Sequence, residues 1–208
     1  MYSSCFDIQK RVASIGGVAS TALLAHLENH HRPSIKKHEQ RKHTIDPSYL
    51  IHNDETPYKF LFTIGNPYDI ILSLWRRNFQ MIHEVSMSFG KYWFESPHEF
   101  TDWHIKPWST LEDCLQGYDP YHMAEHINNW VNYKINGNAQ IWIVKYENLS
   151  RYIKEIMEFF ECDRPFSVRP RSCDWTKEQN HIKDGLVDTY GDIKRMVDRL
   201  PPLMKKGK

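Results

Sequence analysis

The chain has 208 residues, 40% of them apolar and 13% aromatic with seven Trp, and this composition supports a folded core and excludes a disordered chain. Its 27 basic and 26 acidic residues nearly balance, which excludes the strongly basic character of most nucleic-acid-binding proteins. We therefore predict a single domain over residues 1–208, with no nucleic acid among its partners.

The cysteines and the apolar runs indicate the cellular compartment in which the protein is expected. The four cysteines are far apart and form no CxxC pair, so they predict neither a zinc site nor a disulfide framework: Cys5, Cys114, Cys162 and Cys173. No apolar run approaches the roughly 20 residues of a membrane span, and the first residues lack the layout of a signal peptide. These features predict reduced thiols, a cytoplasmic location and no membrane partner.

Three short apolar runs predict buried strands at 11–15, 59–64 and 140–145. Each run precedes a helical pattern, and this alternation is typical of a parallel sheet with crossover helices. The expected fold is α/β: a three-layer sandwich with a central parallel sheet and a P-loop-like strand–loop–helix at the N-terminus.

The loop after the first strand is the first candidate anion site. Its glycines allow a close approach of the backbone, and a helix starting at Ser20 would offer free N–H groups. The Walker pattern GxxxxGK[ST] is absent, so an ordinary NTPase is not predicted. The alternative is a tight turn capped by Ser20. The candidate phosphate-binding residues are Gly16, Gly17, Val18, Ala19, Ser20 and Thr21.

The stretch 30–43 follows the first predicted helix and is basic, with five Lys or Arg residues against one acid, Glu39. It is interpreted either as a solvated loop or as an attractor for a polyanionic ligand.

The second predicted helix begins at Pro67, with Asn66 as its N-cap, and its apolar period continues to Ile82. Ser73 and Arg76 fall on its polar stripe, and with Asn66 they are the candidate phosphate-binding residues of this segment. Because ligands collect at the carboxyl ends of parallel strands, this strand–helix junction and the first one can face a single ligand with separated phosphates. The alternative for Arg76 is a surface ion pair.

The remaining segments complete the chain. An aromatic-rich insertion at about 88–118 is interpreted as packing beside the site, as a lid, or as core. Helices are expected at about 120–130, 149–160 and 185–200, the last ending before Pro201. Before this last helix, a basic loop contains Arg171, which can clamp a phosphate.

In this order the segments resemble the sulfotransferase superfamily. The loop 16–21 resembles the family's 5′-phosphosulfate loop, and 65–76 strongly resembles its 3′-phosphate segment R-x-P-x-D-x-x-x-S-x-x-R. Residues 144–149 closely match its V-x-Y-E-x-L strand end, and the pair Asn129-Trp130 also looks like the family. The resemblance implies 3′-phosphoadenosine-5′-phosphosulfate (PAPS) as sulfuryl donor, no metal, and a hydroxyl- or amine-bearing acceptor such as a glycan or small molecule.

Two cations of the family pattern are absent. Gly65 stands where the family places the Arg of the 3′-phosphate site, and the N-terminal loop lacks the family's Lys or Arg. The resemblance implies a base after the first helix, and we predict His43, with Lys42 supplying the missing charge. The alternative is a non-catalytic nucleotide- or anion-binding relative of the same fold. The oligomeric state is not predicted.

Overall fold

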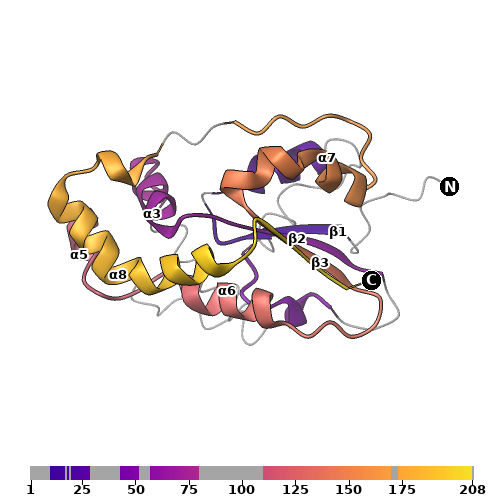
Figure 1. Ribbon diagram of the computed structural model, residues 1–208, viewed down its shortest axis with the longest axis horizontal. Helices are drawn as coiled ribbons and strands as arrows, with labels where there is room; N and C mark the ends of the chain where they lie inside the picture. Colours follow the sequence, from indigo (N-terminus) through magenta and orange to yellow (C-terminus); the bar gives the residue numbers. More distant parts are fainter. Residues whose placement is uncertain are drawn as a thin grey trace, which may run out of the picture.

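The computed structural model describes residues 10–16, 18, 20–28, 43–51, 57–79, 110–169 and 173–207. They form a mixed α/β fold around one four-stranded sheet (Figure 1). The strands lie in chain order: β1 (Lys10–Ser14), β2 (Lys59–Ile64), β3 (Gln140–Lys145) and β4 (Leu203–Lys206). The three predicted strands are confirmed. They are parallel to one another, whereas β4 is antiparallel to β3, so the sheet is mixed.

Six α-helices and three one-turn 3₁₀ helices surround the sheet in the described part of the chain. The α-helices are α1 (Ser20–Glu28), α3 (Pro67–Arg76), α5 (Leu111–Cys114), α6 (Met123–Asn132), α7 (Leu149–Phe159) and α8 (Asn180–Arg199). The 3₁₀ helices are η1 (Pro47–Tyr49), η3 (Tyr146–Asn148) and η4 (Trp175–Lys177).

Both faces of the sheet are buried, as expected for parallel strands. On one face, Val12, Leu61 and Val144 pack against α1 and α7. On the other, side chains such as Phe60 and Ile143 belong to one buried cluster with residues of α3, α6 and α8. Figure 1 shows α1 and α7 together on one side of the sheet and α6 on the opposite side.

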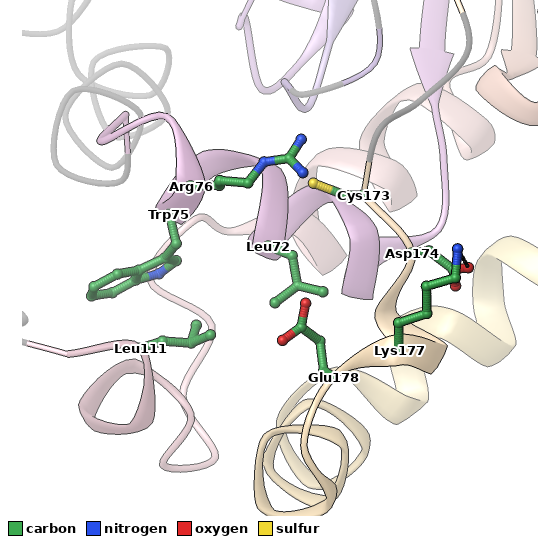
Figure 2. A pocket seen from close by; sticks show the side chains of 8 residues that line it. All are labelled: Leu72, Trp75, Arg76, Leu111, Cys173, Asp174, Lys177 and Glu178. Atoms are coloured by element: carbon green, nitrogen blue, oxygen red, sulfur yellow. Dashed lines mark ion pairs between the residues drawn. The ribbon is translucent and has the colours of Figure 1, made fainter.

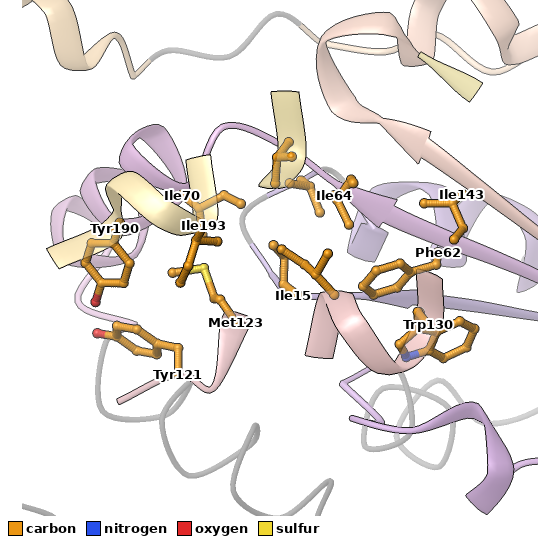
Figure 3. Close-up of a cluster of buried hydrophobic side chains, with 14 of the residues drawn as sticks. Ile15, Phe62, Ile64, Ile70, Tyr121, Met123, Trp130, Ile143, Tyr190 and Ile193 are labelled. Atoms are coloured by element: carbon orange, nitrogen blue, oxygen red, sulfur yellow. The ribbon is translucent and has the colours of Figure 1, made fainter. Parts of the chain in front are cut away.

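The centre of the second core is aromatic (Figure 3). Phe62 of β2 and Trp130 of α6 are both fully buried, and their rings stack with centroids 4.9 Å apart and planes 9° apart. Phe60 meets the edge of Trp130 at 5.8 Å, and His126 lies 5.2 Å from Phe62. This stack fixes α6 against the middle of the sheet.

An acidic side chain joins the amino ends of two strands. Lys10 and Lys59 are paired in the register of β1 and β2, and their like charges repel. Glu161, just after α7, contacts Lys10 Nζ at 2.7 Å and Lys59 Nζ at 2.5 Å. The hydrogen bonds from Lys10 and Lys59 lower the pKa of Glu161 to about 2. The single negative charge of this carboxylate therefore offsets part of the repulsion between two lysines on one sheet edge.

We expect Glu161→Gln to lower the free energy of unfolding at neutral pH and to have little effect near pH 2, where the carboxyl of Glu161 becomes protonated. A carboxyl whose folded pKa lies below its ordinary value of 4.5 stabilises the fold above that pH, and the contribution is lost as the pH falls toward 2. Because the side chain of Glu161 is 64% exposed, solvent screening limits the effect to about 0.5–1 kcal/mol at pH 7. Urea unfolding of both proteins from pH 7 to pH 2 measures it, and a difference that stays constant over this range contradicts the assignment.

Candidate functional site at the carboxyl edge of the sheet

The parallel strands bring three predicted segments to one edge. In the register, Ser14 pairs with Thr63 and Thr63 pairs with Val144, so β1, β2 and β3 end together. The loop after β1, the start of α3 and the turn η3 therefore meet at the carboxyl edge, where ligands of parallel sheets bind.

The loop after β1 folds around the Ser14 hydroxyl. Gly16, with a positive φ of 88°, donates its backbone N–H to Ser14 Oγ at 3.2 Å. The Ser14 and Ser20 hydroxyls lie 2.7 Å apart, and both side chains are buried. The Gly16 amide is thus engaged within the loop. An anion at this loop would instead use the first amides of α1, which have no partner inside the helix.

The other predicted loop residues divide into three kinds. Val18 is buried in the core, so its side chain serves packing. Thr21 is exposed in the first turn of α1. Gly17 and Ala19 lie outside the described residues. The loop therefore offers backbone and hydroxyl groups, and the described part of it contains no Lys or Arg.

His43 lies against the end of β1. Its side chain is only 4% exposed, and its Nδ1 is 2.9 Å from the Ser14 carbonyl oxygen. A carbonyl only accepts, so Nδ1 carries a proton and donates it to Ser14; in a neutral His43 ring the lone pair is then on Nε2. The structure thus brings His43 to the N-terminal loop, 29 positions earlier in the chain. Lys42 lies outside the described residues.

The residue after His43 is clamped to α6. The Thr44 carbonyl oxygen accepts hydrogen bonds from His126 Nε2 at 2.7 Å and from Trp130 Nε1 at 2.9 Å. His126 and Trp130 are four positions apart on one face of α6. Sequence reasoning missed this contact, and the only available signal was a polar ring and an indole on the apolar face of one helix.

The start of α3 is held by two oxygens. Asn66 Oδ1 accepts from the Tyr68 amide at 3.1 Å, which confirms Asn66 as the N-cap. The backbone N–H of Asn66 donates to Glu147 Oε1 at 2.9 Å. Glu147 lies in η3, directly after β3. A carboxylate therefore already occupies the positive end of the α3 dipole. A phosphate is disfavoured there by charge repulsion.

Arg76 lies at the opposite end of α3. At 1.5 Å per residue it is about 14 Å from the first residue of the helix. It lines a pocket of about 380 Å³ between α3 and the loop before η4 (Figure 2). The lining residues are Leu72, Trp75, Arg76, Leu111, Cys173, Asp174, Lys177 and Glu178. Ser73, half-buried one turn earlier, accepts from Arg77 Nε through its carbonyl at 2.9 Å.

The loop before η4 is tied to the first turn of α3. Asp69 Oδ1 accepts from the Trp175 amide at 2.9 Å, and the rings of Tyr68 and Trp175 meet edge to face at 4.7 Å. Through these contacts Cys173 reaches the wall of the pocket that contains Arg76. Arg171, two positions before Cys173, lies outside the described residues, as does most of the aromatic segment 88–118.

Two further findings concern metals and membranes. Among the residues that the structure describes, no cluster of three or more His, Cys, Asp or Glu side chains could hold a metal ion. None of the described helices combines the length and the apolar character needed to cross a bilayer.

No family model matches this chain, and neither a curated protein nor a solved structure is significantly similar to it.

Proposed function

We propose that the chain is a cytoplasmic sulfotransferase-like enzyme that transfers a sulfuryl group from PAPS to a hydroxyl or amine of a glycan or small-molecule acceptor. The fold would be a three-layer sandwich with a P-loop-like N-terminus. The observation that carries the proposal is the meeting of His43, the loop after β1 and the Glu147–Asn66 pair at one sheet edge. This spatial arrangement supports the proposal together with the order of the segments along the chain, which resembles that of the sulfotransferase superfamily.

The charges at this edge suggest where the donor would bind. Glu147 repels an anion from the start of α3, whereas the start of α1 contains no acidic side chain in its first turn. The 5′-phosphosulfate would therefore meet the α1 amides together with the hydroxyls of Ser20 and Thr21. The 3′-phosphate would lie toward Ser73 and Arg76, farther along α3. A nucleotide with two separated anionic groups suits two such separated positions.

The chemistry would be an in-line displacement. The acceptor oxygen forms a bond to sulfur while the bond from sulfur to the 5′-phosphate oxygen breaks, and 3′-phosphoadenosine-5′-phosphate leaves. The proton of the acceptor hydroxyl would pass to Nε2 of His43. Negative charge shared by the peripheral oxygens would be stabilised by the α1 amides and by Lys42.

We expect His43→Gln to lower kcat by about 10²–10⁴-fold, because a general base contributes that much. Binding of 3′-phosphoadenosine-5′-phosphate should be unchanged, since the base contacts the acceptor rather than the nucleotide. Transfer of radiolabelled sulfate from PAPS to mixed glycans and phenols, together with calorimetric titration of the nucleotide, measures both. The matched control is His181→Gln, because His181 is an exposed residue of α8. Full turnover of His43→Gln contradicts the assignment.

The second candidate is a relative that binds the nucleotide without catalysis. It is favoured by the Gly16 amide, which is engaged with Ser14 and so is withdrawn from the cradle, and by Gly65 at the position of the family's Arg. The same pair of measurements separates the two candidates. Tight nucleotide binding without any sulfate transfer identifies the binding protein, and absence of both rejects the sulfotransferase proposal.

A further inference from the structure

We infer that His126 and Trp130 are positioning residues that hold the His43 imidazole in one tautomer, with its proton on Nδ1. Both act through the Thr44 carbonyl, which belongs to the peptide group between Thr44 and Ile45, one residue beyond His43. The chemical use of this tautomer rests on the proposed function, whereas the proton on Nδ1 follows from the hydrogen bond to the Ser14 carbonyl.

The Thr44 carbonyl is saturated by its two donors. A carbonyl oxygen has two lone pairs, and His126 Nε2 and Trp130 Nε1 occupy them at 2.7 and 2.9 Å. Thr44, His126 and Trp130 are all buried, so water does not compete for these bonds. The backbone on the C-terminal side of His43 is thereby fixed in position.

The two donors are themselves rigid. The Trp130 ring stacks on Phe62, and the His126 ring lies 5.2 Å from the same phenylalanine, in the middle of β2. Figure 3 shows Phe62 and Trp130 facing one another within the core. A shift of Thr44 would require α6 to move against the sheet, and a closely packed core resists such movement.

His43 is consequently anchored at two places, through its ring and through the backbone that follows it. Its backbone is anchored through Thr44 to α6, and its Nδ1–H is directed to the Ser14 carbonyl at the end of β1. Rotation of the ring would leave the buried Ser14 carbonyl without this donor, which is unfavourable. The lone pair therefore stays on Nε2, the atom that accepts a proton in the proposed reaction.

The experiment is ¹⁵N NMR of the histidine side chains in the full chain, because the nitrogen shifts distinguish Nδ1–H from Nε2–H rings. The His43 signals are assigned by their loss in His43→Gln. In the wild type we expect a single Nδ1–H tautomer. Trp130→Phe removes one donor and keeps the aromatic stack, and His126→Leu removes the other. In both variants the Nε2–H form should appear alongside the Nδ1–H form.

Two variants separate positioning from general packing. His126→Gln retains an N–H donor for Thr44 and should restore the single tautomer. Trp142→Phe changes an indole that stacks on Phe159 on the opposite face of the sheet, so His43 should be unaffected. Thermal unfolding confirms that each variant is folded, and Trp130→Phe, which keeps its stack on Phe62, carries the test if His126→Leu does not fold.

The inference is overturned if wild-type His43 is an Nε2–H ring or a mixture, or if Trp130→Phe leaves the single tautomer unchanged. Activity is scored separately. With sulfate transfer present, Trp130→Phe should lower kcat by roughly 10–100-fold at unchanged KM for PAPS, since small misplacements of a catalytic group cost that much. A tautomer that responds as expected in a protein without transfer supports the positioning role and rejects the proposed function.

Discussion

Phe62→Ala is expected to lower the free energy of unfolding by about 4 kcal/mol, the largest effect on stability that we predict. Phe62 is fully buried in the central strand β2, where it contacts both Trp130 and His126. Truncation removes the buried ring and leaves a cavity that the parallel strands cannot close, because hydrogen bonds fix their spacing. Urea unfolding followed by tryptophan fluorescence measures the loss.

The control is a phenylalanine outside the core. Phe79 is 45% exposed and its ring contacts the Arg77 guanidinium, so Phe79→Ala should cost less than about 1 kcal/mol. Phe62→Leu should lie between the two variants because it fills part of the cavity. Equal losses for the two alanine variants would mean that the aromatic stack does not organise the core.

Lys206→Met is expected to lower the free energy of unfolding by about 2 kcal/mol, the second-largest effect on stability. Its Nζ donates to the carbonyls of Trp130, Val131 and Tyr133, at 3.3, 2.9 and 2.6 Å. These carbonyls lie at or just after the C-terminal turn of α6, where the helix dipole also favours a cation. Charged hydrogen bonds contribute about 1.5–3 kcal/mol, and the burial that lowers the pKa of Lys206 offsets part of this gain.

The neighbouring lysine provides a matched control in the same strand. Lys205 extends over the Trp142 ring at 4.3 Å and contacts Glu155 at the surface, with its side chain 48% exposed. Lys205→Met should therefore cost less than about 1 kcal/mol. The comparison uses chemical denaturation at pH 7 and low salt. If Lys205→Met proves as damaging as Lys206→Met, the three carbonyl contacts are not the source of the stability.

The elements that were predicted well are those with a periodic burial pattern. The limits of β2 and β3 are confirmed, and β1 begins one residue earlier than predicted. The starts of α3 and α7 are also confirmed. Asn66 and Pro67 mark the start of α3, and the turn after β3 precedes the start of α7. Apolar runs and helix starts depend on local chemistry, which a sequence displays directly.

Two helix ends differ from the prediction for identifiable reasons. The apolar period of α3 continues to Ile82, but the helix ends at Arg76, followed by Asn78 in the left-handed region with φ 54°. The sequence predicts that the last helix begins at about Gly185, whereas α8 begins at Asn180. Gly185 serves close packing instead, because a Cβ there would meet the Leu115 side chain at 3.0 Å.

The strand β4 was not predicted. Its four residues after Pro201-Pro202 have no distinctive alternation, and they form a strand only because α8 returns the chain beside β3. The contacts of Thr44 and Glu147 were missed for the same reason. Each contact joins residues that are far apart in the sequence through one backbone group. The periodicity of apolar residues does not predict such contacts. The prediction of His43 as a base did not include its hydrogen bond to Ser14 at the end of β1.

The pairing of the sheet has a consequence for how the chain folds. Lys10 pairs with Lys59, and Lys59 pairs with Gln140, so neighbouring parallel strands are about 50 and 80 residues apart. Closing such loops costs conformational entropy before any strand contact compensates for it. Folding of this domain should therefore be slow for its size, and the helices should acquire structure earlier than the sheet. Stopped-flow circular dichroism would then show helical signal preceding the burial of Trp130 against Phe62.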